Sequence, residues 1–307
     1  MRKCVLLTGA GGFLAGHVAT AFRSAGWRTV GVGRSDRHGQ AGRFDTFHLQ
    51  DLGDVPRLMS LLAAMLPDVL VHLAAPASVP ASLREPLADL IGHVIPTGNL
   101  LEAVRCSHPA PRVILVSSAA VYGNPRTLPV PETAPLAPIS PYGFHKVQQE
   151  LVLDEYVALH GVRACKVRVF STYGENLRRL AVWEIARRAR TGNAEVFGTG
   201  DESRDYLDAA DVGHAIVCVA ERAAFGGEAI NVASGQEVLV RTLASDVFRL
   251  IGFDAAPRFS GQMLDGSPAR WRADTTRLRE LGCPALSWSG GLARTVAWIG
   301  TQPLDTR

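Results

Sequence analysis

Apolar, strand-like runs alternate with helical patterns through the first 170 residues, and this alternation constrains the fold more than any other feature. We predict strands at 3–8, 28–33, 45–49, 69–74, 112–118 and 164–170, and helices at 13–25, 54–66, 86–106 and 142–160. Such alternation indicates βαβ units. The strands are continuous apolar runs, as expected where both faces of a sheet are covered. The sequence therefore predicts an α/β fold with a Rossmann-type, doubly wound parallel sheet.

The pattern becomes less regular after residue 170. We predict helices near 180–191, 211–222, 240–251 and 289–300, and short strands near 195–197, 206–208 and 229–233. We therefore expect an NAD(P)-binding domain over 1–170, to which 205–233 returns, and a smaller C-terminal α/β substrate lobe over 171–307. The proline-rich loop 124–141 is too long for a simple connector, so we expect it to line a site.

Composition excludes several classes of protein. The 307 residues are 47% hydrophobic and 20% charged, which is typical of a globular chain. A net charge of +3 is too small to indicate a nucleic-acid partner or an anionic membrane surface. The apolar stretch 58–75 is interrupted by Pro67, which argues against a membrane span. The five cysteines lack ligand spacing, so we expect no disulfide framework, no metal site, and a reducing, cytoplasmic location.

A glycine-rich loop follows the first predicted strand, with the sequence TGAGGFLAG over residues 8–16. Glycines permit a tight turn there and let backbone N–H groups approach a pyrophosphate at a helix N-terminus. A glycine cluster alone is a weak signal. Its place between a strand and a helix favours a dinucleotide site over a plain strand–helix turn.

The end of the second strand bears on the choice of cofactor. NAD-binding chains usually carry an acidic residue there, which bonds the ribose hydroxyls. This chain has Gly33 at that place, followed by Arg34. The missing carboxylate removes repulsion from a 2′-phosphate, and a guanidinium can pair with one. We therefore expect NADP, with NAD possible; the alternative is that Arg34 is an ordinary surface arginine.

Tyr142 and Lys146 are four residues apart at the start of a predicted helix, so both project from one face. A phenol has an unperturbed pKa of about 10, and a nearby ammonium lowers it by favouring the phenolate. The pair therefore predicts acid–base chemistry by Tyr142. Lys146 would also bond the nicotinamide ribose and orient the cofactor.

These motifs together resemble the extended short-chain dehydrogenase/reductase family of nucleotide-sugar epimerases, dehydratases and reductases. The family's loop, TGxxGFxG, is matched at Gly9, Gly12 and Phe13, whereas Ala15 replaces its third glycine. The resemblance extends over about residues 1 to 300. It implies further cofactor contacts from Leu14, Asp51, Leu52, Leu73, Ala74, Ala75 and Phe170, besides Tyr142 and Lys146.

The segment VSSAAVYG, residues 116–123, resembles the family's catalytic SSAAVYG segment. The resemblance implies that the Ser118 hydroxyl joins Tyr142 and Lys146 and polarises a substrate oxygen. Ser117 is expected to make local backbone hydrogen bonds instead. Ala119 and Ala120 stand where the family's 4,6-dehydratases carry Asp-Glu, so dehydratase activity is not expected.

The C-terminal lobe resembles the substrate part of the family. RVFSTYG, residues 168–174, resembles RxFNxYG, with Ser171 in place of asparagine, and Ser203-Arg204-Asp205 resembles a segment whose arginine grips a diphosphate. The resemblance implies substrate contacts from Ser78, Ser118, Ser171, Arg178, Arg204 and Arg270. The alternative for Arg204 is a local pair with Asp205 or Asp208. The alternative for Arg178 is a solvated helix start.

One segment departs from the family pattern. This chain has HVIPT over residues 93–97 where NVxGT is usual. Pro96 is expected to kink or break the helix. His93 is either a buried histidine satisfied by its neighbours or a polar support for the active site.

We therefore predict an NAD(P)-dependent oxidoreductase that acts at C4 of a nucleotide-diphosphate sugar. The favoured activity is a 4-ketoreductase that uses NADPH, because Arg34 favours NADP; the alternative is a UDP-glucose 4-epimerase-like enzyme with tightly bound NAD(P). A non-catalytic NADP-binding sensor is a remote alternative, since Tyr142 and Lys146 are both present. The family implies a homodimer through helices 86–106 and 142–160. We expect no nucleic-acid, membrane or metal partner.

Overall fold

The computed structural model describes residues 2–36, 39–262 and 266–304. Its centre is a seven-stranded parallel sheet with the strand order β11-β6-β5-β4-β1-β2-β3. The strands are β1 Cys4–Thr8, β2 Arg28–Gly33, β3 Thr46–Leu49, β4 Val69–His72, β5 Arg112–Ser118, β6 Ala164–Val169 and β11 Gly226–Val232. The chain order reverses on either side of β1, which is the doubly wound arrangement that the sequence predicts.

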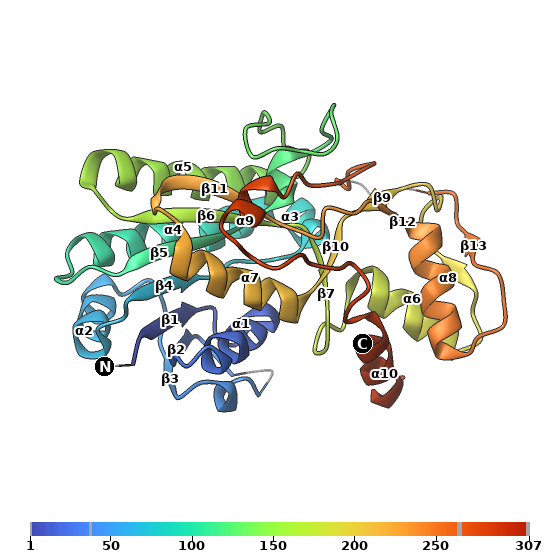
Figure 1. Ribbon diagram of the computed structural model, residues 1–307, viewed down its shortest axis with the longest axis horizontal. Coiled ribbons are helices and arrows are strands. Elements are labelled where there is room, and N and C mark those ends of the chain that lie inside the picture. Colours follow the sequence, from blue (N-terminus) through green and yellow to red (C-terminus); the bar gives the residue numbers. More distant parts are fainter. Residues whose placement is uncertain (1, 37–38, 263–265, 305–307) are drawn as a thin grey trace.

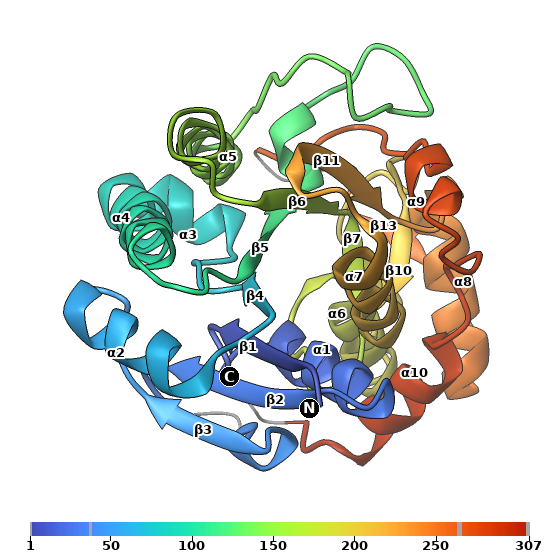
Figure 2. The ribbon, with the colours of Figure 1, turned by 60° about the vertical axis from the view of Figure 1, so that its left-hand side comes forward.

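Helices cover both faces of this sheet, as Figure 2 shows. Val5 and Leu7 of β1 pack toward α1 Phe13–Ser24 and α7 Ala209–Arg222. Leu6 packs on the other face, toward α2 Val55–Met65, α4 Pro86–Arg105 and α5 Pro141–His160. Alternate residues of one strand therefore enter two separate hydrophobic cores, which is why the strands are apolar throughout.

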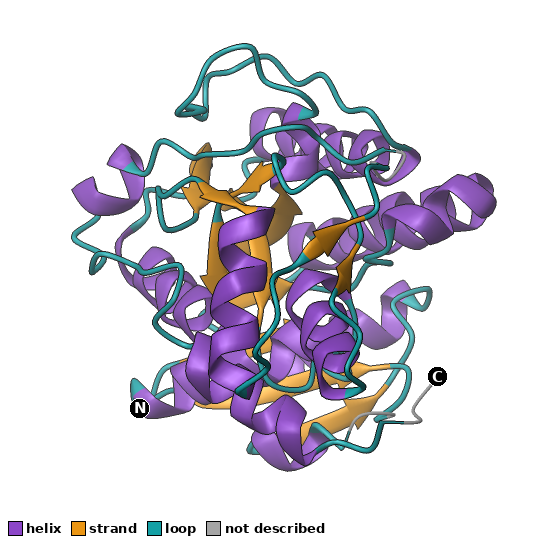
Figure 3. Cartoon of the chain, turned by 90° about the vertical axis from the view of Figure 1, so that its right-hand side faces the viewer, coloured by secondary structure: helices purple, strands orange, loops and turns teal. Residues whose placement is uncertain are grey.

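A smaller group of elements lies beside the carboxyl ends of the strands (Figures 1 and 3). Three helices, α6 Leu180–Arg190, α8 Val240–Ile251 and α10 Leu292–Thr301, share a third core. Short strand pairs accompany them: β7 Ser171–Tyr173 with β10 Tyr206–Asp208, β9 Ser203–Arg204 with β12 Val238–Leu239, and β8 Glu195–Val196 with β13 Arg258–Phe259. The remaining short elements are η1 Ala41–Arg43, α3 Val79–Arg84, η2 Ala119–Tyr122 and α9 Thr276–Glu280.

Helix α4 continues through Pro96, so the prediction of a break there was wrong. Proline removes one backbone donor from the helix. Hydrogen bonds next to the proline tie this part of α4 together and to α5: the His93 carbonyl accepts from Thr97 Oγ1 at 2.8 Å and from Gln149 Nε2 at 3.1 Å.

A disulfide joins Cys218 of α7 to Cys283, which follows α9. The sequence analysis expected no such bond, and for this pair it was wrong. The two cysteines are 65 residues apart, so only the packing of the 276–283 segment against α7 brings them together. Cys4, Cys106 and Cys165 are free. Within the described ranges, no helix is long and apolar enough to cross a membrane.

Candidate active site

A cleft of about 750 Å³ opens at the carboxyl ends of β1, β4, β5 and β6 and continues toward α6. This edge of a parallel sheet is where open α/β folds bind ligands. Most of the predicted site residues line the cleft: Gly9, Gly12, Phe13, Leu14, Leu73, Ala75, Ser78, Ser118, Tyr142, Lys146, Phe170, Ser171 and Arg204. The other predicted residues, Arg34, Asp51, Leu52, Ala74, Arg178 and Arg270, are outside its lining.

The glycine loop has the geometry of a dinucleotide cradle. Gly9 has a φ of +66°, and a Cβ on it would lie 2.8 Å from the backbone of Ala74. A Cβ on Gly12 would lie 3.0 Å from the Gly9 carbonyl oxygen. Gly12 is also the N-cap of α1 and provides no side-chain cap. The first-turn N–H groups of α1 are thus left for an anion, so these residues fit a cofactor pyrophosphate.

Ser118, Tyr142 and Lys146 meet in the middle of the cleft. Ser118 ends β5, and its hydroxyl accepts a hydrogen bond from the Ala120 amide at 3.2 Å. Tyr142 and Lys146 are on the first turns of α5, which begins at Pro141 and has the Ser140 hydroxyl as its N-cap. The Lys146 ammonium donates to the Val116 carbonyl at 3.0 Å and lies 6.0 Å from the centre of the Tyr142 ring.

Burial dominates the electrostatics of this pair. It raises the pKa of Tyr142, and the Ser118 hydroxyl and the Arg179 charge oppose the rise. The sequence analysis expected Lys146 to lower this pKa, and the direction is the reverse because a phenolate loses hydration in an apolar cleft. Burial also lowers the pKa of Lys146 to about 8, against the charges of Glu150 and Asp89.

Arg204 faces the cleft and, among the residues that the structure describes, has no carboxylate partner. Its guanidinium donates to the carbonyls of Ser203 and Ala269, at 2.8 and 3.3 Å, and lies 5.6 Å from the centre of the Trp271 ring. Asp205 instead accepts from Ser234 and Gly235, and Asp208 pairs with Arg294 at 2.7 Å. The structure therefore does not pair Arg204 with either aspartate.

Two other arginines are placed differently from expectation. Arg178 is exposed, bonds Gln302 at 2.7 Å and lies outside the cleft lining, whereas its neighbour Arg179 lines the cleft and donates to the Ala77 carbonyl at 2.6 Å. Arg270 is also outside the lining, because Glu237 holds it at 2.7 Å. The family resemblance implied Arg178, and only the path of the chain into α6 distinguishes it from Arg179.

Arg34 and Asp51 lie side by side at the ends of neighbouring strands. The Arg34 Nε is 3.9 Å from the Asp51 carboxylate, and the side chains are 83% and 62% exposed. Such an exposed pair is weak, so either group is available to a ligand. Leu52 is buried in the core below them.

A buried network missed by the sequence analysis supports the cleft from behind. Ser117 donates to Glu150 at 2.5 Å rather than to the local backbone, and Glu150 pairs with Arg168 at 2.7 Å. Arg168 also donates to Tyr122 Oη at 2.9 Å and to the Glu132 carbonyl at 2.8 Å. The loop 124–141 contributes Glu132 to this network and no residue to the lining of the cleft, whereas its Pro129 lines a second pocket of about 360 Å³.

Comparison with known proteins identifies the family. The model of the NAD dependent epimerase/dehydratase family matches residues 5–233. UDP-glucose 4-epimerase of Mycolicibacterium smegmatis is 33% identical, with 96% of this chain and 97% of that protein covered. The structure of UDP-glucose 4-epimerase of Thermotoga maritima with UDP-glucose is 27% identical, with a TM-score of 0.87 and coverage of 97% of this chain and 99% of that one.

A second similar structure contains a cofactor. It is the complex of UDP-glucuronic acid 4-epimerase of Bacillus cereus with UDP-glucuronic acid and NAD, at 25% identity and a TM-score of 0.86, with 97% of this chain and 99% of that one covered. The family match and the full-length relative agree with the fold and the glycine cradle. The chain therefore belongs to the NAD-dependent epimerase/dehydratase family, the extended short-chain dehydrogenase/reductase enzymes that act on nucleotide sugars.

Proposed function

We propose that this enzyme is a nucleotide-sugar 4-epimerase that retains its dinucleotide through the catalytic cycle. The observation that carries the proposal is one cleft that combines the glycine cradle, the Ser118–Tyr142–Lys146 group and Arg204. The relatives named UDP-glucose 4-epimerase support this activity better than the 4-ketoreductase that the sequence analysis favoured. We further propose that residues 1–170 with 205–233 bind the cofactor, and that the lobe 171–307 provides most substrate contacts.

The chemistry follows from the three side chains in the centre of the cleft. The bound dinucleotide would supply the hydride acceptor and donor. Tyr142 takes the proton from the sugar C4 hydroxyl and later returns it to the C4 oxygen, once the keto sugar has turned its other face toward the hydride donor. Ser118 donates a hydrogen bond to the same oxygen and polarises the ketone. Lys146 holds a positive charge near the phenolate and would bond the nicotinamide ribose. Ala119 and Ala120 offer no group that could move water, so the reaction stays at C4.

Activity without added cofactor tests this proposal. The purified protein should interconvert UDP-glucose and UDP-galactose when no nucleotide is added, and its denatured extract should release NAD(H) or NADP(H), identified by mass. A 4-ketoreductase would instead need stoichiometric NADPH and a 4-keto sugar. Dependence of turnover on added NADPH would therefore favour the ketoreductase and contradict the proposal.

Arg204 is proposed to bind the substrate diphosphate. Arg204→Ala should raise the substrate KM by about one to two decades, because a charge-assisted hydrogen bond contributes roughly 1.5–3 kcal/mol. Arg204→Lys should recover part of the loss, since a point charge cannot copy a bidentate fork. The matched control is Arg270→Ala, which removes a neighbouring arginine held by Glu237 outside the cleft. Calorimetric titration with UDP measures the effect, and unchanged UDP affinity in Arg204→Ala would remove this residue from the site.

We propose that Arg34 selects the cofactor by contact with a 2′-phosphate. Arg34→Ala should weaken NADP binding by about one to two decades and NAD binding little, because only NADP carries that phosphate. Arg57→Ala is the control, since it removes an exposed arginine of α2 outside the cleft lining and should leave both affinities unchanged. Fluorescence titration of protein freed of its retained dinucleotide, with both nucleotides, measures this. Wild-type preference for NAD would overturn the NADP assignment and leave the epimerase proposal standing.

We also propose that two copies pair through α4 and α5. Leu87, Ile91 and Ile95 of α4 are spaced four apart and are 67%, 52% and 55% exposed. Phe144 and Leu151 of α5 are 54% and 59% exposed. An apolar surface of this extent on two adjacent helices is typical of an interaction face.

A cytoplasmic location, which the sequence analysis expected, remains a prediction.

A further inference from the structure

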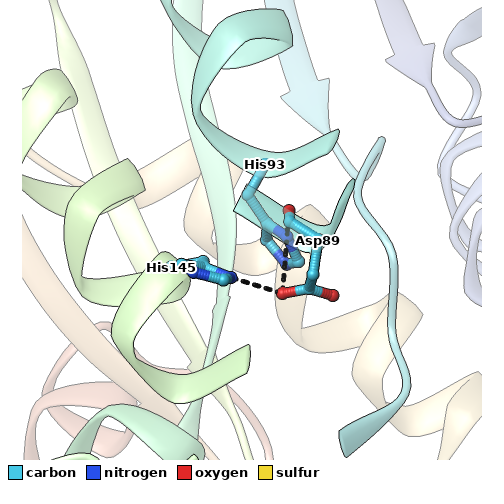
Figure 4. Close-up of side chains that lie close together, drawn as sticks. All are labelled: Asp89, His93 and His145. Atoms are coloured by element: carbon cyan, nitrogen blue, oxygen red, sulfur yellow. Dashed lines mark hydrogen bonds and ion pairs between the residues drawn. The ribbon is translucent and has the colours of Figure 1, made fainter. Parts of the chain in front are cut away.

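Three buried titratable side chains lie together behind the proposed catalytic pair (Figure 4). Asp89 and His93 come from one face of α4, and His145 comes from α5. The Asp89 Oδ2 atom is 2.5 Å from His145 Nδ1 and 3.4 Å from His93 Nδ1. The side chains are 4%, 0% and 10% exposed. Buried charges and imidazoles are costly unless they interact, so the grouping calls for an explanation.

The hydrogen bonds assign the protons within this cluster. A carboxylate only accepts hydrogen bonds, so His145 Nδ1 carries the proton that it donates to Asp89. His93 Nδ1 faces the Asp89 backbone carbonyl at 2.7 Å and therefore also carries a proton. Burial, followed by the Lys146 charge, lowers the pKa of His93 to about 4, so this imidazole is neutral. Asp89 Oδ2 therefore accepts from His145, and the Asp89 backbone carbonyl accepts from His93.

The cluster touches the catalytic turn directly. His145 lies between Tyr142 and Lys146 in the sequence, on the same turns of α5. The His93 ring meets the Tyr142 ring edge to face, with centroids 5.6 Å apart. The groups around Lys146 are Glu150 and Tyr142 of α5, Asp89 and His93 of α4, His72 of β4 and the Val116 carbonyl of β5. Among them, the two negative charges are those of Glu150 and Asp89, and Arg168 already neutralises Glu150.

We propose that Asp89 is a positioning residue for the reaction. Through its hydrogen bond to His145, Asp89 fixes the catalytic turn of α5 against α4. It also supplies the buried negative charge that keeps Lys146 protonated. His93 completes the arrangement by packing on Tyr142 and directing its N–H to the Asp89 backbone. This proposal concerns residues outside the cleft lining and deepens the proposed function, on which its kinetic readout rests. His93, at the position where the family usually has asparagine, contacts the Asp89 backbone and the Tyr142 ring.

The same three side chains offer donor atoms within 4.8 Å of one another, which would suit a cation by distance. The chemistry of the donors argues otherwise. Both Nδ1 atoms carry hydrogens directed at Asp89 oxygens, and a metal would require their lone pairs. The positive charge of Lys146 already disfavours protonation of His93, and it would disfavour a second cation for the same reason.

A lysine titration tests the proposal without any substrate. The chain has only three lysines, Lys3, Lys146 and Lys166, so protein labelled with ¹³C at the lysine ε-carbon gives three signals, and Lys146→Met assigns one of them. Asp89→Asn keeps an acceptor for His145 and removes the charge. We expect the Lys146 signal to titrate about one pH unit lower in this variant, the size of shift that a nearby charge commonly causes.

Matched variants separate charge from structure. Asp154→Asn removes the partner of Lys166 and should move only the Lys166 signal. His145→Asn keeps a donor to Asp89 and its charge, so it should not lower the Lys146 titration. If Asp89→Asn does not fold, the double variant Asp89→Asn/His145→Asn retains a neutral hydrogen-bonded pair and should show the same lowering. An unchanged Lys146 titration in the folded variant would overturn the proposal, as would a bound metal that Asp89→Asn releases.

The kinetic readout follows from the sign of the shift. If turnover requires protonated Lys146, the alkaline limb of kcat/KM for UDP-galactose should move to lower pH by the same amount in Asp89→Asn, with the substrate KM nearly unchanged at neutral pH. A purely structural role for Asp89 would lower activity at every pH and leave the limb in place. Absence of wild-type turnover with UDP-galactose would count against the epimerase and not against the lysine titration.

Discussion

Tyr142→Phe is expected to reduce turnover by about two to four decades, the usual contribution of a positioned acid–base group. The phenylalanine keeps the ring that packs on His93 but lacks the hydroxyl that exchanges a proton with the sugar. Binding of the dinucleotide and of UDP should change little, because the hydroxyl is needed only in the chemical step. Steady-state kinetics with UDP-galactose, together with both titrations, measures the effect.

The control for this variant is Tyr156→Phe, on the same helix. Tyr156 Oη bonds Glu102 at 3.2 Å, outside the cleft lining, so its loss should leave turnover within about twofold of wild type. Near-normal turnover in Tyr142→Phe would contradict the assignment of the acid–base group. Equal losses in the two variants would indicate a general effect on α5.

Arg168→Met should destabilise the protein by about 3–5 kcal/mol, the cost of leaving a buried carboxylate without its partner. Arg168 and Glu150 are 5% and 2% exposed, and Arg168 also bonds Tyr122 and the Glu132 carbonyl. The variant therefore leaves several polar groups without their hydrogen-bond partner, and these groups link β5, β6, α5 and the loop 124–141. Urea unfolding followed by circular dichroism measures the change in the free energy of unfolding.

An exposed ion pair provides the comparison. Arg188→Ala removes a partner of Glu195 at 3.2 Å, with side chains 32% and 53% exposed, and should cost no more than about 1 kcal/mol. Replacing both Arg168 and Glu150 by methionine should cost less than Arg168→Met alone, because no unpaired charge remains. A loss below about 1 kcal/mol in Arg168→Met would show that water reaches Glu150 and that the network is not a support of the cleft.

Local periodicity explains why the central sheet could be predicted. The strands β1, β4 and β5 are buried on both faces, so each reads as a short apolar run, and α2 between them begins at a side-chain N-cap, Asp54. The glycine loop was predictable for a related reason. A φ of +66° and a carbonyl 3.0 Å from the Gly12 Cβ position admit few residues other than glycine. These are properties of one segment and its immediate neighbours.

The features that the sequence did not predict depend on contacts between distant segments. Asp89 and His145 are 56 residues apart and meet only because α4 packs on α5. Cys218 and Cys283 are brought together in the same way. The choice between Arg178 and Arg179 depends on the first turn of α6. Arg270 was assigned to the substrate because the sequence does not reveal its ion pair with Glu237. The raised pKa of Tyr142 follows from burial, which a spacing of four residues does not reveal.

The fate of the hydrogen at C4 tests the central claim most directly. UDP-glucose carrying deuterium at C4 would be incubated with the purified protein, without added nucleotide, and the products examined by mass spectrometry and NMR. The account predicts UDP-galactose that retains the deuterium at C4, because the hydride leaves the sugar and returns to it within one closed cleft, and it predicts no conversion by Tyr142→Phe. Loss of the deuterium to solvent, its transfer to a dissociating cofactor, or the absence of any UDP-galactose would contradict the account.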